Sequence, residues 1–158
     1  MLTNSHPVAG DLALNPKSKT ALIVMSMIVR CQTTLLDELH GNKLMRVDYS
    51  KSGMLRINGS YHVYAISLWR SSLNYLILPQ DARVPNWYPA ELFAVTEETL
   101  DPDSHFMCFG KEDPRGLIAV WGYPEMVKDP DHYVNLIERD PTALQIFFMR
   151  KELIDSAK

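Results

Sequence analysis

The chain has 158 residues, of which 46% are hydrophobic, 22% charged and 9% aromatic, so it can form one domain with a hydrophobic core. The 7 glycines are scattered and only 2 cysteines occur, which excludes collagen-like repetition and a disulfide scaffold. The ordinary hydrophobic content excludes intrinsic disorder, and the formal net charge of −3 argues against general binding of nucleic acid.

Cysteine usage and the N-terminal residues indicate where the protein works. Cys31 and Cys108 lie within apolar segments, which is typical of reduced, buried thiols in the cytosol. Residues 1–19 lack the basic and apolar segments of a signal peptide. The longest apolar run, residues 21–29, is about half the length of a membrane-spanning helix. We therefore expect a cytoplasmic protein that is not inserted in a membrane.

The N-terminal part of the chain predicts a flexible arm followed by one long helix. Residues 1–15 show no sustained period and are expected to form the arm, and residues 16–158 are expected to form a single α+β domain. Apolar residues recur three and four positions apart until Gly41, which predicts a helix over residues 17–40. A buried strand over residues 21–29 is the alternative interpretation. The apolar positions of the predicted helix are Ala21, Val24, Met25, Ile28, Cys31, Leu35 and Leu39.

The period falls to two in the middle of the chain, which predicts strands. Apolar and polar residues alternate in a way that favours four antiparallel strands with short connections. These strands are predicted over residues 45–49, 55–57, 61–69 and 73–78. Residues 80–89 predict an ordered loop, because they contain two prolines, a tryptophan and a tyrosine. Further short strands are predicted over residues 92–95, 106–109 and 116–123.

Two Asp-Pro pairs mark helix starts near the C-terminus. Asp129-Pro130 and Asp140-Pro141 each place a side-chain acceptor directly before a proline that suits the first helical turn. They predict two short helices, the second with an apolar stripe that covers a sheet. The predicted fold is therefore α+β, with a long N-terminal helix packed on a curved antiparallel sheet of about six or seven strands and two short C-terminal helices.

No motif in the sequence identifies a catalytic, cofactor or metal site. The chain has no nucleophile elbow, no glycine-rich phosphate loop and no paired cysteines for zinc. Asp101, Asp103 and His105 alternate as metal ligands on an extended segment would, but Pro102 and Ser104 between them are typical of a turn. The sequence therefore predicts a non-enzymatic protein without a cofactor or a metal ion.

Charge is distributed unevenly along the chain and favours protein binding. Residues 80–158 contain 15 acidic and 8 basic residues, and an acidic surface attracts basic partners. Rigid aromatic side chains such as Trp87 and Tyr88 supply the contact area of many interfaces. The predicted partner-binding residues are Asp81, Trp87, Tyr88, Glu91, Glu97, Glu98, Asp101, Asp103, Glu112 and Asp113. In size and acidity the chain is similar to bacterial immunity proteins, which implies that it neutralises a cognate toxin by occluding the toxin's active site.

Two other functions remain open from the sequence. The first is a small-molecule-binding protein or small enzyme with a pocket between the long helix and the concave sheet, lined by polar residues. Its predicted lining is His62, Tyr64, His105 and Glu125. The second is a homo-oligomeric subunit, which an apolar surface along residues 21–29 or 147–153 would indicate.

Overall fold

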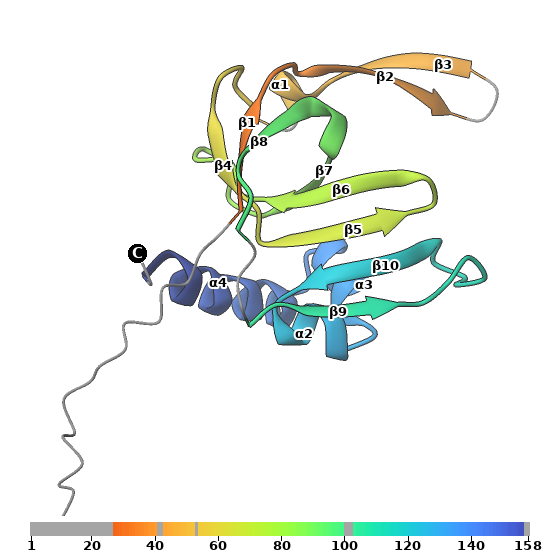
Figure 1. Ribbon diagram of the computed structural model, residues 1–158, viewed down its shortest axis with the longest axis vertical. Helices are drawn as coiled ribbons and strands as arrows, with labels where there is room; N and C mark the ends of the chain where they lie inside the picture. The colour runs from red at the N-terminus through yellow and green to blue at the C-terminus, as the bar shows by residue number, and fades with distance from the viewer. Residues whose placement is uncertain (1–26, 41–42, 53, 100–102, 157–158) are drawn as a thin grey trace, which may run out of the picture.

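The computed structural model describes residues 27–40, 43–52, 54–99 and 103–156. Within these residues antiparallel strands dominate, and helices cover one side of the larger sheet (Figure 1). The strands are β1 (Ile28–Cys31), β2 (Leu35–His40), β3 (Lys43–Asp48), β4 (Ser60–His62), β5 (Ala65–Trp69), β6 (Ser72–Ile77), β7 (Asn86–Pro89), β8 (Phe93–Glu97), β9 (His105–Cys108) and β10 (Leu117–Gly122). The helices are α1 (Tyr49–Ser52), the 3-10 helix η1 (Ala90–Leu92), α2 (Pro124–Lys128), α3 (His132–Ile137) and α4 (Pro141–Ser156).

The long N-terminal helix predicted over residues 17–40 is wrong. Its described part forms β1 and β2, and α4 at the C-terminal end is the only described helix of seven or more residues. Ile28 and Val29 are β-branched, which disfavours a helix, and Val29 pairs with Tyr61 on one side and Val95 on the other. Apolar spacing alone does not separate a buried strand from a helix, so this tertiary pairing decided the outcome. The predicted arm and residues 17–26 lie outside the described residues.

Six strands from two separate sheets surround one core, and we call this part of the fold the barrel. β1 pairs with β4 and β8, while β5, β6 and β7 form part of a five-stranded sheet with the order β7-β6-β5-β10-β9. The chain passes from the first sheet to the second at residues 63–64 and returns through η1, so the two sheets curve toward each other (Figure 1). The barrel core that they enclose consists of Met27, Val29, Cys31, Leu55, Tyr61, Val63, Tyr75, Ile77, Tyr88 and Leu92.

A separate two-stranded hairpin, β2–β3, extends from this barrel on the same side as the β5–β6 hairpin (Figure 1). The backbone N–H of Tyr49 donates a 2.8 Å hydrogen bond to the carbonyl of Thr34, which closes the base of the β2–β3 hairpin. The strand predicted over residues 55–57 is not formed. Asn58 has a φ of 65°, and the N–H of Gly59 bonds to the carbonyl of Arg56 at 2.9 Å, so this segment is a tight turn.

The C-terminal helices cover the sheet at β5 and β10. They are three helices and not two short ones, and α4 alone has 16 residues. α4 begins at Pro141, where one Oδ of Asp140 accepts hydrogen bonds from the N–H groups of Thr142 (2.9 Å) and Ala143 (3.0 Å). The fully buried Phe147 of α4 packs on Tyr64 with ring centroids 5.2 Å apart. None of the described helices has the length and apolar character needed to cross a membrane.

Candidate functional site

A groove with a volume of about 610 Å³ lies between the β2–β3 hairpin and the β5–β6 turn. We call it the acidic groove. Segments that are far apart in the sequence meet in it, from β2, α1, the β5–β6 turn, β7 and η1. Its lining residues are Leu36, Asp37, Glu38, Tyr49, Trp69, Arg70, Ser71, Ser72, Asn74, Trp87, Pro89 and Glu91.

The aromatic side chains of the acidic groove are held by the strands that carry them. Trp69 ends β5 and pairs with Ser72 across a two-residue turn, and the residue is 37% exposed. The guanidinium carbon of Arg70 lies 4.4 Å from the centroid of this ring, a cation–π contact. Trp87 and Tyr88 are neighbours on β7 and therefore face opposite sides of the sheet. Tyr88 lies in the barrel core, and Trp87 is half-buried at the groove.

Carboxylates outnumber cations along the acidic groove. Of the described residues, Asp37, Glu38 and Glu91 line it together with one cation, Arg70. Arg46, on the neighbouring strand, donates hydrogen bonds of 2.8 and 3.1 Å to Asp37 and holds the pKa of this carboxyl below its usual value. The hydroxyl of Tyr49 donates a hydrogen bond to Glu38. The excess of acidic side chains along the groove favours cationic groups of a partner.

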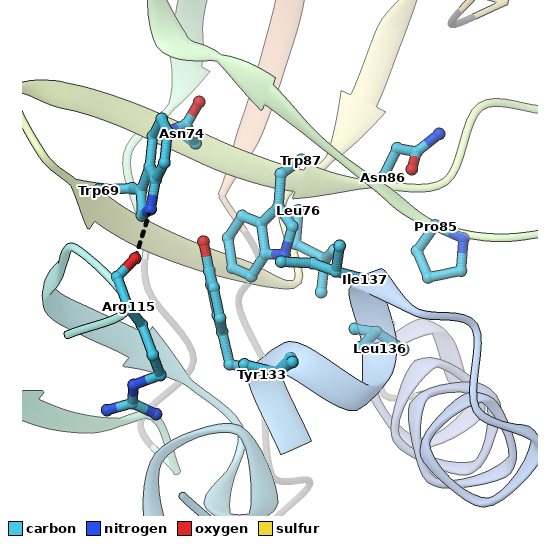
Figure 2. Close-up of a pocket in the computed structure, with 11 residues that line it drawn as sticks. Trp69, Asn74, Leu76, Pro85, Asn86, Trp87, Arg115, Tyr133, Leu136 and Ile137 are labelled. Carbon is cyan, nitrogen blue, oxygen red and sulfur yellow. Dashed lines mark hydrogen bonds between the residues drawn. The ribbon is translucent and has the colours of Figure 1, made fainter. Parts of the chain in front are cut away.

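A second cavity, with a volume of about 540 Å³, lies between the sheet and α3 (Figure 2). We call it the helix-side cavity. It shares Trp69, Asn74 and Trp87 with the acidic groove, and the ring centroids of Trp87 and Tyr133 are 5.1 Å apart within its wall. Its full lining is Trp69, Asn74, Leu76, Pro85, Asn86, Trp87, Arg115, Tyr133, Val134, Leu136 and Ile137.

A third cavity of about 470 Å³ brings together two of the residues predicted to line a pocket, His62 and Tyr64. Ion pairs border it on both sides, Arg56 with Asp81 and Lys151 with Asp155 at 2.5 Å. Burial raises the pKa of Tyr64, whose hydroxyl lies 3.4 Å from Asp155 as a hydrogen-bond donor. This cavity contains charges of both signs, and each charge is already paired.

The other two residues of the predicted pocket lie elsewhere. His105 begins the edge strand β9, and Glu125 lies on α2, where Arg150 donates hydrogen bonds of 2.6 and 2.7 Å to its carboxylate. This guanidinium lowers the pKa of Glu125. The predicted location of the pocket, between a long N-terminal helix and the sheet, is corrected because the described residues contain no such helix.

The predicted partner-binding residues are spread over several parts of the surface and core. Trp87 and Glu91 line the acidic groove. Tyr88 is 2% exposed and touches the ring of Tyr49 from inside the barrel. Two of the predicted carboxylates are already paired with arginines: Asp81 with Arg56 from a distant segment, and Asp113 with Arg115 of the same turn at 2.8 Å.

The remaining predicted acidic residues lie on exposed segments away from the groove lining. Glu97 ends β8 and Glu98 follows it, and Asp103 and Glu112 lie before and after β9. Asp101 is outside the described residues. Sequence reasoning missed Asp37, Glu38, Tyr49 and Trp69. The signal for the first two was an acidic pair within an N-terminal half that is otherwise basic.

Metal-ligating side chains do not gather anywhere in the part of the chain that the structure describes. No group of three or more His, Cys, Asp or Glu residues there has a spacing that would hold a metal ion. Cys31 is buried and its pKa is raised by burial, while Cys108 is exposed on β9. Comparison of the chain with known protein families, with curated proteins and with solved structures gave no match.

Proposed function

We propose that the protein is a binding domain that holds an extended, basic, proline-containing segment of another protein in the acidic groove. The observation that carries this proposal is that Trp69 and Trp87 lie in one groove with three carboxylates and a single cation. Trp87 and Glu91 were already predicted from the sequence to bind a partner. In our proposal, the acidic groove is the surface at which these two residues contact the partner.

The aromatic lining favours a proline-rich segment. Grooves lined by aromatic rings, such as those of SH3 and WW domains, bind chains in the polyproline II conformation, because this conformation is already extended and loses little entropy on binding. Tyr49, Trp69, Trp87 and Pro89 offer such a lining here. Trp69 is the most accessible of the four, since more than a third of its surface is exposed.

The charge of the groove favours a basic segment. Asp37, Glu38 and Glu91 would attract arginine or lysine side chains, which speeds association and selects against acidic partners. Because these groups are close to solvent, added salt should weaken the attraction. A cognate toxin remains our predicted partner. If the bound basic segment belonged to the toxin's active site, its binding in the groove would block that site.

A peptide titration of the full chain tests the proposal. The probe is an acetylated decapeptide of proline with arginine at every third position, and its controls carry glutamate for arginine or glycine for proline. We expect saturable binding of the arginine peptide alone, weakened by salt. Equal binding of the arginine and glutamate peptides would contradict the proposed charge recognition, and no binding of any peptide would contradict the proposed function.

Matched variants locate the contact. Trp69→Ala should weaken peptide binding about thirtyfold, the effect typical of a central aromatic contact. Glu91→Gln should weaken it about twofold to fivefold, and Glu152→Gln, a change of the same kind at an exposed position of α4, should leave it unchanged. If Trp69→Ala remains folded and binds the peptide as well as the wild type, the peptide does not occupy this groove.

A further inference from the structure

The indole nitrogen of Trp87 is buried and has no hydrogen-bond partner among the described residues. Buried tryptophan N–H groups usually find an acceptor, and a donor left without one costs about 1–3 kcal/mol relative to a bonded donor. An unbonded buried donor in a native fold needs an explanation, and one explanation is a bound molecule that accepts its hydrogen bond.

Trp87 lines the helix-side cavity, and Figure 2 shows the side chain of Ile137 next to its indole nitrogen. The cavity's volume of about 540 Å³ falls within the range of small-molecule sites. Figure 2 shows the indole of Trp87 lying across the cavity, with the ring of Tyr133 on one side and Ile137 on the other. Ile137 is 54% exposed, so its side chain can rotate to admit an acceptor atom without disturbing the core.

The aromatic walls favour a flat molecule. Trp69, Trp87 and Tyr133 present ring faces and edges to the cavity, and offset or tilted stacking against such rings stabilises a planar ligand. The remaining lining adds aliphatic surface from Leu76 and Val134.

The cavity also favours a ligand without charge. Among the residues that the structure describes, no carboxylate lines it, and Arg115 supplies the only ionic side chain. The guanidinium of Arg115 is already committed, because it donates to Asp113 at 2.8 and 2.9 Å and to the carbonyl of Pro130 at 2.7 Å. Figure 2 shows this guanidinium pointing away from the two tryptophans. The described lining therefore offers a charged ligand no free counterion.

We propose that the helix-side cavity binds a small, uncharged heteroaromatic molecule, and that a ring acceptor atom of this molecule takes the hydrogen bond of the Trp87 indole N–H. This proposal does not rest on the peptide proposal, since it requires nothing of the carboxylates in the acidic groove, but the two sites share Trp69, Asn74 and Trp87. The ligand class follows from the three properties of the cavity: aromatic walls, no free charge and one unpaired donor.

Two probes of the same size test the proposal on the wild-type chain. Quinoline is flat, uncharged at neutral pH and carries one ring nitrogen that accepts a hydrogen bond, whereas naphthalene has the same shape and no acceptor. The measurement is a titration followed by the indole N–H resonances of the 3 tryptophans in a ¹⁵N-labelled protein. We expect quinoline to shift the Trp87 resonance downfield and to bind about threefold to tenfold more tightly than naphthalene.

A pair of tryptophan variants provides the second arm. Trp87→Phe keeps an aromatic ring and removes the donor, so it should bind both probes equally. Trp121→Phe, at a tryptophan that does not line this cavity, should keep the preference for quinoline. Equal affinities of the wild type for the two probes, or no change of the Trp87 resonance, would overturn the proposal. The wild-type titration decides the question even if Trp87→Phe fails to fold.

Discussion

The indole N–H of Trp69 donates a 2.8 Å hydrogen bond to the backbone carbonyl of Arg115, which ties the end of β5 to the turn before β10. This bond helps to hold Trp69, the most exposed aromatic residue of the acidic groove, in place. It also makes the backbone at residues 115–116 part of the support for the site. Substitutions in that turn should therefore act on the groove as well as on stability.

Gly116 offers a direct test of this support. Its φ is 73°, and a Cβ there would lie 3.2 Å from Trp69 Nε1 and 3.2 Å from Arg70 Cγ. Gly116→Ala should lower the free energy of unfolding by more than the about 1–2 kcal/mol expected for a left-handed backbone, and it should weaken peptide binding by displacing Trp69. Urea unfolding and the peptide titration measure the two effects.

Gly110 is the matched control, because its φ is 85° and a Cβ there meets nothing within 4 Å. Gly110→Ala should show the backbone cost alone and bind the peptide normally. If the two alanine variants are equally stable and bind equally well, Trp69 does not depend on the turn at residues 115–116.

The buried His132 should make stability depend on pH. Its Nε2 lies 2.7 Å from the hydroxyl of Tyr123, and burial lowers the pKa of this histidine below its ordinary value of 6.5. Below pH 6.5 the unfolded chain binds a proton that the folded chain does not, so stability should be full above pH 6.5 and should fall as the pH drops below it. Urea unfolding between pH 7.5 and about 5 measures this loss.

His132→Gln separates the histidine from the carboxyl groups that titrate at lower pH. The variant should be less stable than the wild type at pH 7.5, because it disturbs a buried hydrogen bond. It should also lose little further stability down to pH 5. A variant that loses as much stability as the wild type over this interval would assign the pH dependence to another group.

Two adjacent phenylalanines of α4 should differ sharply in their contribution to stability. Phe147 is fully buried and packs on Tyr64, whereas Phe148 is 36% exposed. Phe147→Ala should lower the free energy of unfolding by about 3–5 kcal/mol, because it leaves a cavity in the core between the helices and the sheet. Phe148→Ala should lower it by about 1 kcal/mol or less. Similar losses would show that α4 packs on the sheet through a different face.

The ion pair between Glu125 and Arg150 should stabilise the packing of α2 on α4. Its two hydrogen bonds of 2.6 and 2.7 Å are bidentate, and both side chains are about two-thirds covered. A double-mutant cycle with Glu125→Gln and Arg150→Gln should give a coupling of about 0.5–1 kcal/mol. The exposed pair of Asp37 and Arg46 should couple less strongly in the same experiment. A larger coupling for the exposed pair would contradict this assignment.

Sequence patterns of neighbouring residues predicted the helix start and the strands that those patterns determine. The Asp140-Pro141 pair coincides with the start of α4, because capping requires only neighbouring residues. The alternation of apolar residues placed strands where β5, β6 and β10 lie. The prediction of an N-terminal helix was wrong because β1 depends on distant residues. Its partners Tyr61 and Val95 are more than 30 residues away in the sequence.

The residues of the candidate site also fall into two groups: those that neighbouring sequence could identify and those that only the fold brings together. Trp87 and Glu91 could be found from the sequence because they lie in one aromatic and acidic segment. Asp37 and Glu38 were assigned to a helix, and only the pairing of β2 with β3 brings them beside η1. Tyr88 shows the reverse error: it follows Trp87 in sequence, but strand geometry turns it into the barrel core.

Trp69, Asn74 and Trp87 belong to the walls of both the acidic groove and the helix-side cavity. A molecule on one side of these residues changes the surface that a molecule on the other side meets. Thermodynamic linkage makes any such influence reciprocal, so a small molecule that alters peptide affinity by some factor has its own affinity altered by the same factor. Under the two proposals, binding of the peptide in the acidic groove therefore depends on the concentration of the small molecule in the helix-side cavity, through two indole rings and one amide that both sites share.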